Sequence, residues 1–118
     1  MFSQRIATAE IESAVAAAVD LTASERCLGR FLQCSTTTRQ GQIWREVPSL
    51  LLDQAREVQR THAGTMGTLE RFAFAGLLNA NRVDHGDGHV LILAGEKTIE
   101  AARRIISRSV PHASPVSA

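Results

Sequence analysis

The densest group of residues that could do chemistry lies in the last third of the chain, where Asp84, His85, Asp87 and His89 alternate with glycines. Aspartate and histidine are ligands that zinc and manganese accept, and a tight turn would bring the two histidines together. The same residue types are also what a β-hairpin turn prefers, because Asp and Gly adopt the backbone conformations of tight turns. We therefore predict a hairpin turn here and no metal site.

The nucleophilic side chains do not fall into a catalytic pattern. Cys27 and Cys34 stand on one predicted helix, where two turns separate them by roughly 10 Å, too far for a disulfide. We expect both to face the core as reduced thiols, where thiols are unreactive. The sequence has no Gly-x-Ser-x-Gly elbow, no phosphate-binding glycine loop and no dinucleotide fingerprint. We predict that the protein is not an enzyme and uses no cofactor.

Length and composition fit one folded domain. The chain has 118 residues, 44% hydrophobic and 21% charged, which is too apolar for a disordered chain. Its net charge is +1, so a nucleic acid would have to meet a local basic patch. Reduced thiols, no long apolar run and a polar N-terminus favour the cytoplasm and no membrane contact. We expect a single domain over residues 1–108 and a disordered tail over 109–118.

Hydrophobic periodicity predicts mostly helix, and the fold class is mostly α (α+β). Thr22 and Glu25 have the spacing of a capping box, and Pro48 suits the start of a helix. A polar connector is expected over 59–64, a loop or short extended segment over 35–42, and a small hairpin that ends in the apolar strand 89–93. Phe72 is expected on a buried helix side. The predicted helices cover residues 6–19, 22–33, 50–58, 65–78 and 95–107.

Two short patterns stand in the middle of the chain. Ala55 is followed three residues later by Val58, and the helix over 65–78 ends in the sequence Gly76-Leu77-Leu78. Over about residues 22–102, these patterns and the order of elements resemble the DNA-binding domain of Crp/Fnr-type regulators. The resemblance implies a winged helix-turn-helix, with 65–78 as recognition helix and the hairpin as wing.

The chain departs from that family in its charged residues. Gln59 stands where the family's turn has glycine. The Arg-Glu pair and the second Arg of the family's recognition helix correspond here to Ala63, Gly64 and Thr68, or to a register shifted by one residue that also lacks them. Contacts to DNA would therefore depend on other side chains.

In a winged helix, the outward side chains of the recognition helix contact base edges and phosphates, and the wing contacts the backbone or minor groove. Three arginines imply modest, salt-sensitive affinity, which a homodimer reading two half-sites would offset. The Ala-rich first helix, the last helix or both would form the dimer. The protein would then be a DNA-binding transcriptional regulator. The predicted contacts to double-stranded DNA are Arg60, Thr61, His62, Thr65, Thr68, Arg71, Arg82 and His89.

A protein-interaction module on the same scaffold, acting as an adaptor or inhibitor of a larger complex, is the second hypothesis. Near-neutral charge suits it, and Trp44, the lone tryptophan, is either a cap on the core or an interface anchor. DNA is favoured if one face collects these arginines: Arg60, Arg71, Arg82, Arg103 and Arg104. A protein partner is favoured if acidic residues interrupt that face: Asp53, Glu57 and Glu70.

Overall fold

The computed structural model describes residues 21–109, which form four helices and one four-stranded sheet. This confirms the expected α+β class. The expected helix over 6–19 lies outside the described residues, and so does the expected tail over 109–118 except for Ser109, which ends α5 instead. No helix in the described range is long and apolar enough to cross a membrane. The elements follow in this order: α2 (Ala23–Gln33), β1 (Thr36–Arg39), β2 (Gln42–Pro48), α3 (Ser49–His62), α4 (Thr68–Leu78), β3 (Asn81–Gly86), β4 (His89–Leu93) and α5 (Glu96–Ser109).

Helix α2 begins at the predicted capping box. The backbone N–H of Glu25 donates to the Thr22 hydroxyl at 3.1 Å, and the backbone N–H of Thr22 donates to the Glu25 carboxylate at 2.9 Å. Two N–H groups that the helix itself leaves without partners are thereby satisfied. The helix buries Leu28, Phe31 and Leu32, so its start and its inward face agree with the sequence prediction.

The sheet joins two antiparallel hairpins in the order β1-β2-β4-β3. The predicted hairpin turns at Asp87 and Gly88, whose φ values are +54° and +76°. Both are positive, as a two-residue turn that matches the strand twist requires. Strand β3 lies at one edge of the sheet, and its register with β4 shifts between Asp84 and Gly86.

The second hairpin adds to the sequence analysis. Residues 35–42 were expected as a loop or short extended segment, and the structure shows the second alternative, because Thr36–Arg39 is extended and pairs with β2. Its run of three β-branched threonines fits a strand, and the turn at Gln40 and Gly41 again has two positive φ values, +54° and +79°. The sheet therefore joins the predicted hairpin to a second one, whose strand β2 contains the short strand that the sequence favours over residues 43–47.

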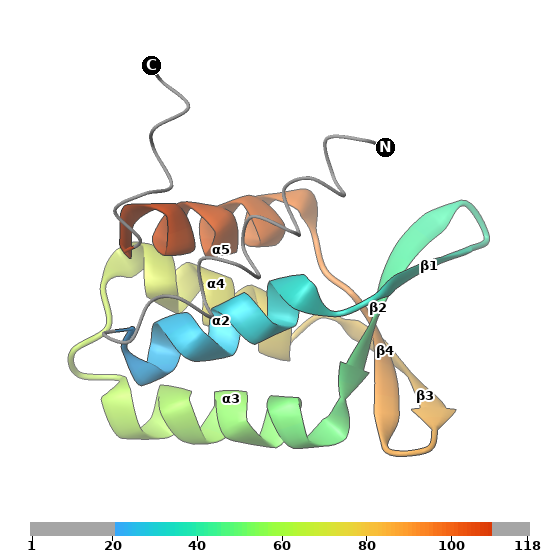
Figure 1. Cartoon of the computed structure of the whole chain (residues 1–118), viewed down its shortest axis with the longest axis horizontal. Coiled ribbons are helices and arrows are strands. Elements are labelled where there is room, and N and C mark those ends of the chain that lie inside the picture. The colour runs from blue at the N-terminus through green and yellow to red at the C-terminus, as the bar shows by residue number, and fades with distance from the viewer. Residues whose placement is uncertain (1–20, 110–118) are drawn as a thin grey trace.

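The helices stack beside one end of the sheet. Figure 1 shows α3 and α5 on opposite sides of α2, with α4 behind it, while both hairpins extend from the same end of the helical layer. Contacts of α2 with α3 and α5, and of α4 with the same two helices, close the core. The largest fully buried side chains are Phe31, Phe74, Leu28, Leu52, Leu77, Leu91, Ile92 and Val47.

Helix α3 is longer than predicted. It begins after Pro48, which is at once the last residue of β2 and the residue that precedes the helix. It ends at His62, about one turn beyond the expected end. Gln59 and Arg60 favour helix intrinsically and continue it, so the connector predicted over 59–64 is wrong for its first four residues.

Helix α4 starts later than predicted. Gly67 has extended backbone angles and precedes the helix, and its N–H donates to the Glu70 carboxylate at 3.1 Å. The N–H groups of Thr65 and Met66 both bond to the carbonyl of His62, which closes the turn between the helices. Residues 65–67 therefore belong to the connector, and the predicted helix over 65–78 is wrong at its beginning.

A close approach between α4 and α5 occurs at Gly76. A methyl group at this position would lie 2.0 Å from the Thr98 hydroxyl oxygen and 2.9 Å from its methyl carbon. Thr98 is itself buried, at 7% exposure, and cannot swing into solvent without disturbing the packing. The absence of a side chain at Gly76 is therefore what allows the two helices to pack at this separation.

We predict that Gly76→Ala destabilises the fold by about 1–3 kcal/mol, because the added methyl group forces α5 away from α4. Urea denaturation followed by circular dichroism measures the change. Gly64→Ala is the matched control, since nothing lies within 4 Å of the corresponding position there. Equal stability of the two variants would contradict the close packing.

Candidate nucleic-acid interface

The connector between α3 and α4 is held by Arg71, one of the predicted DNA contacts. Its Nη2 donates to the carbonyl of Ala63 at 2.9 Å, and its Nε donates to the carbonyl of Met66 at 3.2 Å. Carbonyls at the end of a helix lack partners within the helix, so a guanidinium satisfies them well. Arg71 remains exposed on α4, and its first role is to position the helix pair.

Arg60 and Thr61 lie in the last turns of α3, which corrects the prediction that placed them in a connector and on the recognition helix. The guanidinium of Arg60 donates to the Glu57 carboxylate, and the Thr61 hydroxyl donates to the same carboxylate at 3.4 Å. The hydrogen bond from Arg60, followed by its charge, holds the pKa of Glu57 below its ordinary value. A phosphate approaching Arg60 would therefore meet a neighbouring negative charge.

His62 and Thr65 are exposed at the end of α3 and in the connector, so neither lies on α4 as predicted. The Thr65 hydroxyl donates to the His62 carbonyl at 3.1 Å. Both residues border a shallow hollow beside the start of α2, to which Glu70 also contributes. Thr68 is the first residue of α4 and is exposed, as expected.

The outer face of α4 holds Thr68, Arg71 and Phe72, and the last of these corrects the sequence analysis. Phe72 is 47% exposed, whereas Phe74, which the prediction left out, is fully buried with Ala73 and Leu77. Thr68, Arg71 and Phe72 follow helical spacing once the helix begins at Thr68. The spacing of Ala73, Phe74 and Leu77, at positions i, i+1 and i+4, is the signal that indicates the buried face.

The β3–β4 hairpin carries the two remaining predicted contacts. Arg82 lies on β3, whose residues are all exposed, and its Nη2 donates to the Leu78 carbonyl at the end of α4 at 3.1 Å. His89 begins β4, with its Nδ1 3.0 Å from the carbonyl oxygen of Asp87. In residues 21–109 no three His, Cys, Asp or Glu side chains gather as metal ligands would.

The arginines are divided between opposite sides of the molecule. Arg60 lies on α3, and Arg103 and Arg104 lie on α5, on the other side of α2 (Figure 1). Acidic side chains also stand among the arginines of α3, where Asp53 contacts Arg56 in the same way that Glu57 contacts Arg60. The last helix therefore does not extend the surface of α3, and the arginines do not gather on one face.

The two thiols are shielded rather than activated. Cys27 is buried and Cys34, which follows α2, is half-buried, and both are free. Burial raises the pKa of each to about 11, against the smaller opposing effects of Arg30 on Cys27 and of Arg45 on Cys34. Thiolate, the nucleophilic form, is therefore scarce at neutral pH.

Comparison with models of protein families, with curated proteins and with solved structures found no match for this chain. Its function is therefore inferred from the positions and contacts of its own residues.

We predict that Arg71→Ala lowers the free energy of unfolding by about 1 kcal/mol, because two connector carbonyls lose a charged donor. Urea denaturation measures this loss. Arg104→Ala, which removes an exposed guanidinium from α5, is the control and should leave stability unchanged. If both variants are as stable as the parent protein, the bonds to the connector do not hold the helix pair.

We predict that iodoacetamide alkylates the folded protein at pH 8 roughly a hundredfold more slowly than the protein in urea, because the raised pKa leaves little thiolate. The folded-state rate should then rise as the pH approaches about 11. Mass spectrometry of the time course gives the rate at each cysteine. Rapid labelling of the folded protein at pH 8 would contradict the shielding of the thiols.

Proposed function

We propose that this protein is a DNA-binding transcriptional regulator that uses a winged helix-turn-helix. The observation that supports this proposal is the order and pairing of the elements. Helices α3 and α4 are joined by a connector over residues 63–67, and the β3–β4 hairpin follows α4 directly. Helix α2 and the β1–β2 hairpin precede them, which is compatible with the arrangement that the resemblance to Crp/Fnr-type regulators implies.

In this proposal α4 enters the major groove and the β3–β4 hairpin serves as the wing. Thr68 and Arg71 on the outer face of α4 contact DNA, and Arg82 and His89 contact it from the hairpin. Arg71 uses two of its five N–H donors on the connector, so three remain for a phosphate. Its fixed guanidinium would lose little conformational freedom on binding.

The charge of the described part supports a weak, salt-sensitive interaction. Residues 21–109 carry twelve Arg or Lys and nine Asp or Glu, an excess of three positive charges. Because the apolar residues of α5 are buried inside the fold, as Ala102 and Ile106 illustrate, α5 presents mainly charged side chains outward. We also propose a homodimer with two half-sites for this cytoplasmic regulator, and the charged outer face of α5 disfavours α5 as its apolar contact.

A protein-interaction module is the second candidate, and two observations favour it. Phe72 is 47% exposed in the middle of the outer face of α4, where a DNA reader would carry polar side chains, and Leu50 is 66% exposed on α3. Aromatic residues of this kind often anchor protein interfaces. The acidic partners of Arg56 and Arg60 also lower the positive potential of α3. A less positive surface disfavours DNA but not a protein partner.

The test is fluorescence anisotropy of a labelled duplex of random sequence, titrated with the full chain at about 50 and 200 mM salt. We predict that affinity falls roughly twelvefold between the two salts, the value expected for the two phosphate contacts of Arg71 and Arg82. Arg82→Gln should reduce the slope of log affinity against log salt by about one. Arg104→Gln, on the far helix, should leave the slope unchanged.

No binding at the lower salt would contradict the DNA proposal and favour a protein partner. Equal effects of Arg82→Gln and Arg104→Gln would contradict the assignment of the surface, even if the duplex binds. Circular dichroism of each variant establishes that the fold is intact before the titrations are compared.

A further inference from the structure

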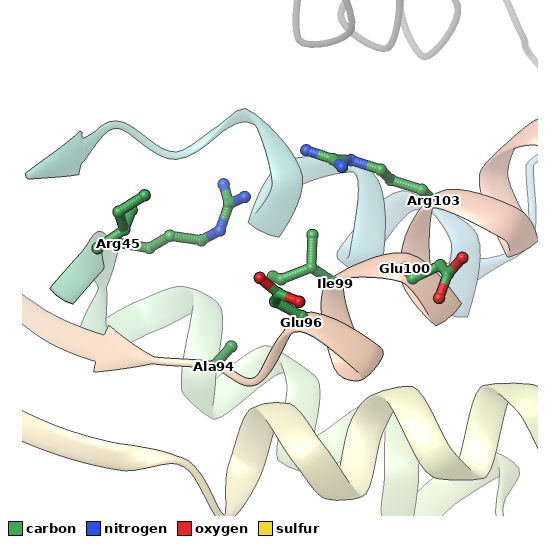
Figure 2. A pocket seen from close by; sticks show the side chains of 7 residues that line it. Arg45, Ala94, Glu96, Ile99, Glu100 and Arg103 are labelled. Atoms are coloured by element: carbon green, nitrogen blue, oxygen red, sulfur yellow. The ribbon is translucent and has the colours of Figure 1, made fainter. Parts of the chain in front are cut away.

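A cavity of about 470 Å³ lies between β2 and the first turns of α5. Its volume is in the range of sites for small molecules, which span roughly 300–1,000 Å³. Figure 2 shows the side chain of Arg45 entering from β2, and those of Glu96, Ile99 and Arg103 from α5. None of these residues belongs to the outer face of α4 or to the β3–β4 hairpin, so the cavity is separate from the proposed DNA surface.

Arg45 is a buried cation on a strand that otherwise turns apolar residues inward. Alternation along β2 places Ile43, Arg45 and Val47 on one face, and Arg45 is only 8% exposed. Its Nη1 donates to the carbonyls of Leu32 at 3.1 Å and Cys34 at 3.5 Å, at the end of α2. These bonds occupy one nitrogen and leave Nη2 and Nε for a further acceptor.

Arg103 faces the same cavity from α5, and no hydrogen bond or ion pair joins it to another residue of the range 21–109. Its Nε is buried and makes no hydrogen bond, which in a folded protein costs free energy. Within residues 21–109 the ion pairs are those of α3, so neither Arg45 nor Arg103 is neutralised by a carboxylate. The two guanidinium groups are close enough for the charge of Arg103 to lower the pKa of Arg45, after the larger effect of burial.

The cavity also has negative and apolar parts. Glu96 and Glu100 line it, are exposed, and pair with neither arginine. Ile43, 53% exposed, and Ile99 supply an apolar wall. Unpaired groups of both signs beside an apolar wall complement a molecule that carries an anionic group, a cationic group and an aliphatic side chain.

We propose that this cavity binds a free aliphatic α-amino acid. Arg45 and Arg103 hold its carboxylate, whose two oxygens match the fork of donors on a guanidinium. Glu96 faces its ammonium group, and Ile43 and Ile99 contact its side chain.

The experiment is isothermal titration calorimetry of the full chain with L-leucine, isocaproate and isoamylamine. The second compound lacks the amino group of leucine and the third lacks its carboxylate. We expect leucine to bind and each analogue to bind at least about tenfold more weakly, because one charged group of the cavity is left unpaired in each case. No heat with leucine, or equal affinity for leucine and isocaproate, would overturn the proposal.

Two variants show whether Arg103 contacts the ligand or only stabilises the fold. Arg103→Met should weaken leucine binding at least about tenfold and leave the urea midpoint of the ligand-free protein unchanged or higher, because the lost donor was unpaired. Arg104→Met, the neighbouring exposed position, should change neither quantity. If Arg103→Met lowers the urea midpoint and leaves leucine binding unchanged, Arg103 has a structural role and does not bind the ligand.

Glu96→Gln tests the ammonium contact independently. It should weaken leucine binding and leave the weaker binding of isocaproate unchanged, since only the first ligand has an ammonium group. Equal weakening of both ligands would overturn the placement of the ammonium group beside Glu96. This variant lies on an exposed first turn, so folding does not depend on it.

Discussion

The close approach of α5 to α4 at Gly76 determines much of what this protein can present to a partner. With no side chain at Gly76, Thr98 packs directly on α4, and the two helices come near enough to bury Ala73, Phe74 and Leu77. The opposite face of α4 is thereby the exposed one. The same contact sets the position of α5, whose first turns form one wall of the cavity beside β2.

Guanidinium groups satisfy the carbonyls at helix ends in this fold, where backbone N–H groups often do so in other helices. Arg71 donates to the connector after α3, Arg82 to the last turn of α4, and Arg45 to the end of α2. In each case a cation meets carbonyls at the negative end of a helix, where the helix dipole favours it. Arginine suits this role because it keeps further donors available after the carbonyl is satisfied, which lysine does less well.

The elements that are stabilised by interactions between neighbouring residues could be predicted from the sequence. The capping box at Thr22, the turn at Asp87 and Gly88 and the last helix could all be predicted because each depends on neighbours in the chain. Strand β1 could not, since its threonines are stabilised by pairing with β2 rather than by burial. The start of α4 was missed because Thr65 favours a helix start as well as Thr68 does.

The candidate interface shows the same limit. The exposure of Thr68 could be predicted from periodicity, because it depends only on the helix being there. Arg71 and Arg82 donate to backbone carbonyls at the ends of α3 and α4. These hydrogen bonds depend on where the two helices end in space, which the spacing of residues in the sequence does not predict. The two arginines of the cavity were missed for the same reason, as Arg45 and Arg103 are far apart in the sequence.

The shifted register of β3 has a consequence for the behaviour of the protein in concentrated solution. As an edge strand, β3 has backbone groups that a strand of another molecule could pair with, which is a common route to aggregation. The irregularity between Asp84 and Gly86 interrupts the regular ladder, and the charges of Arg82 and Asp84 disfavour an incoming strand. Strand β3 can thus stay exposed without pairing with a strand of a neighbouring molecule.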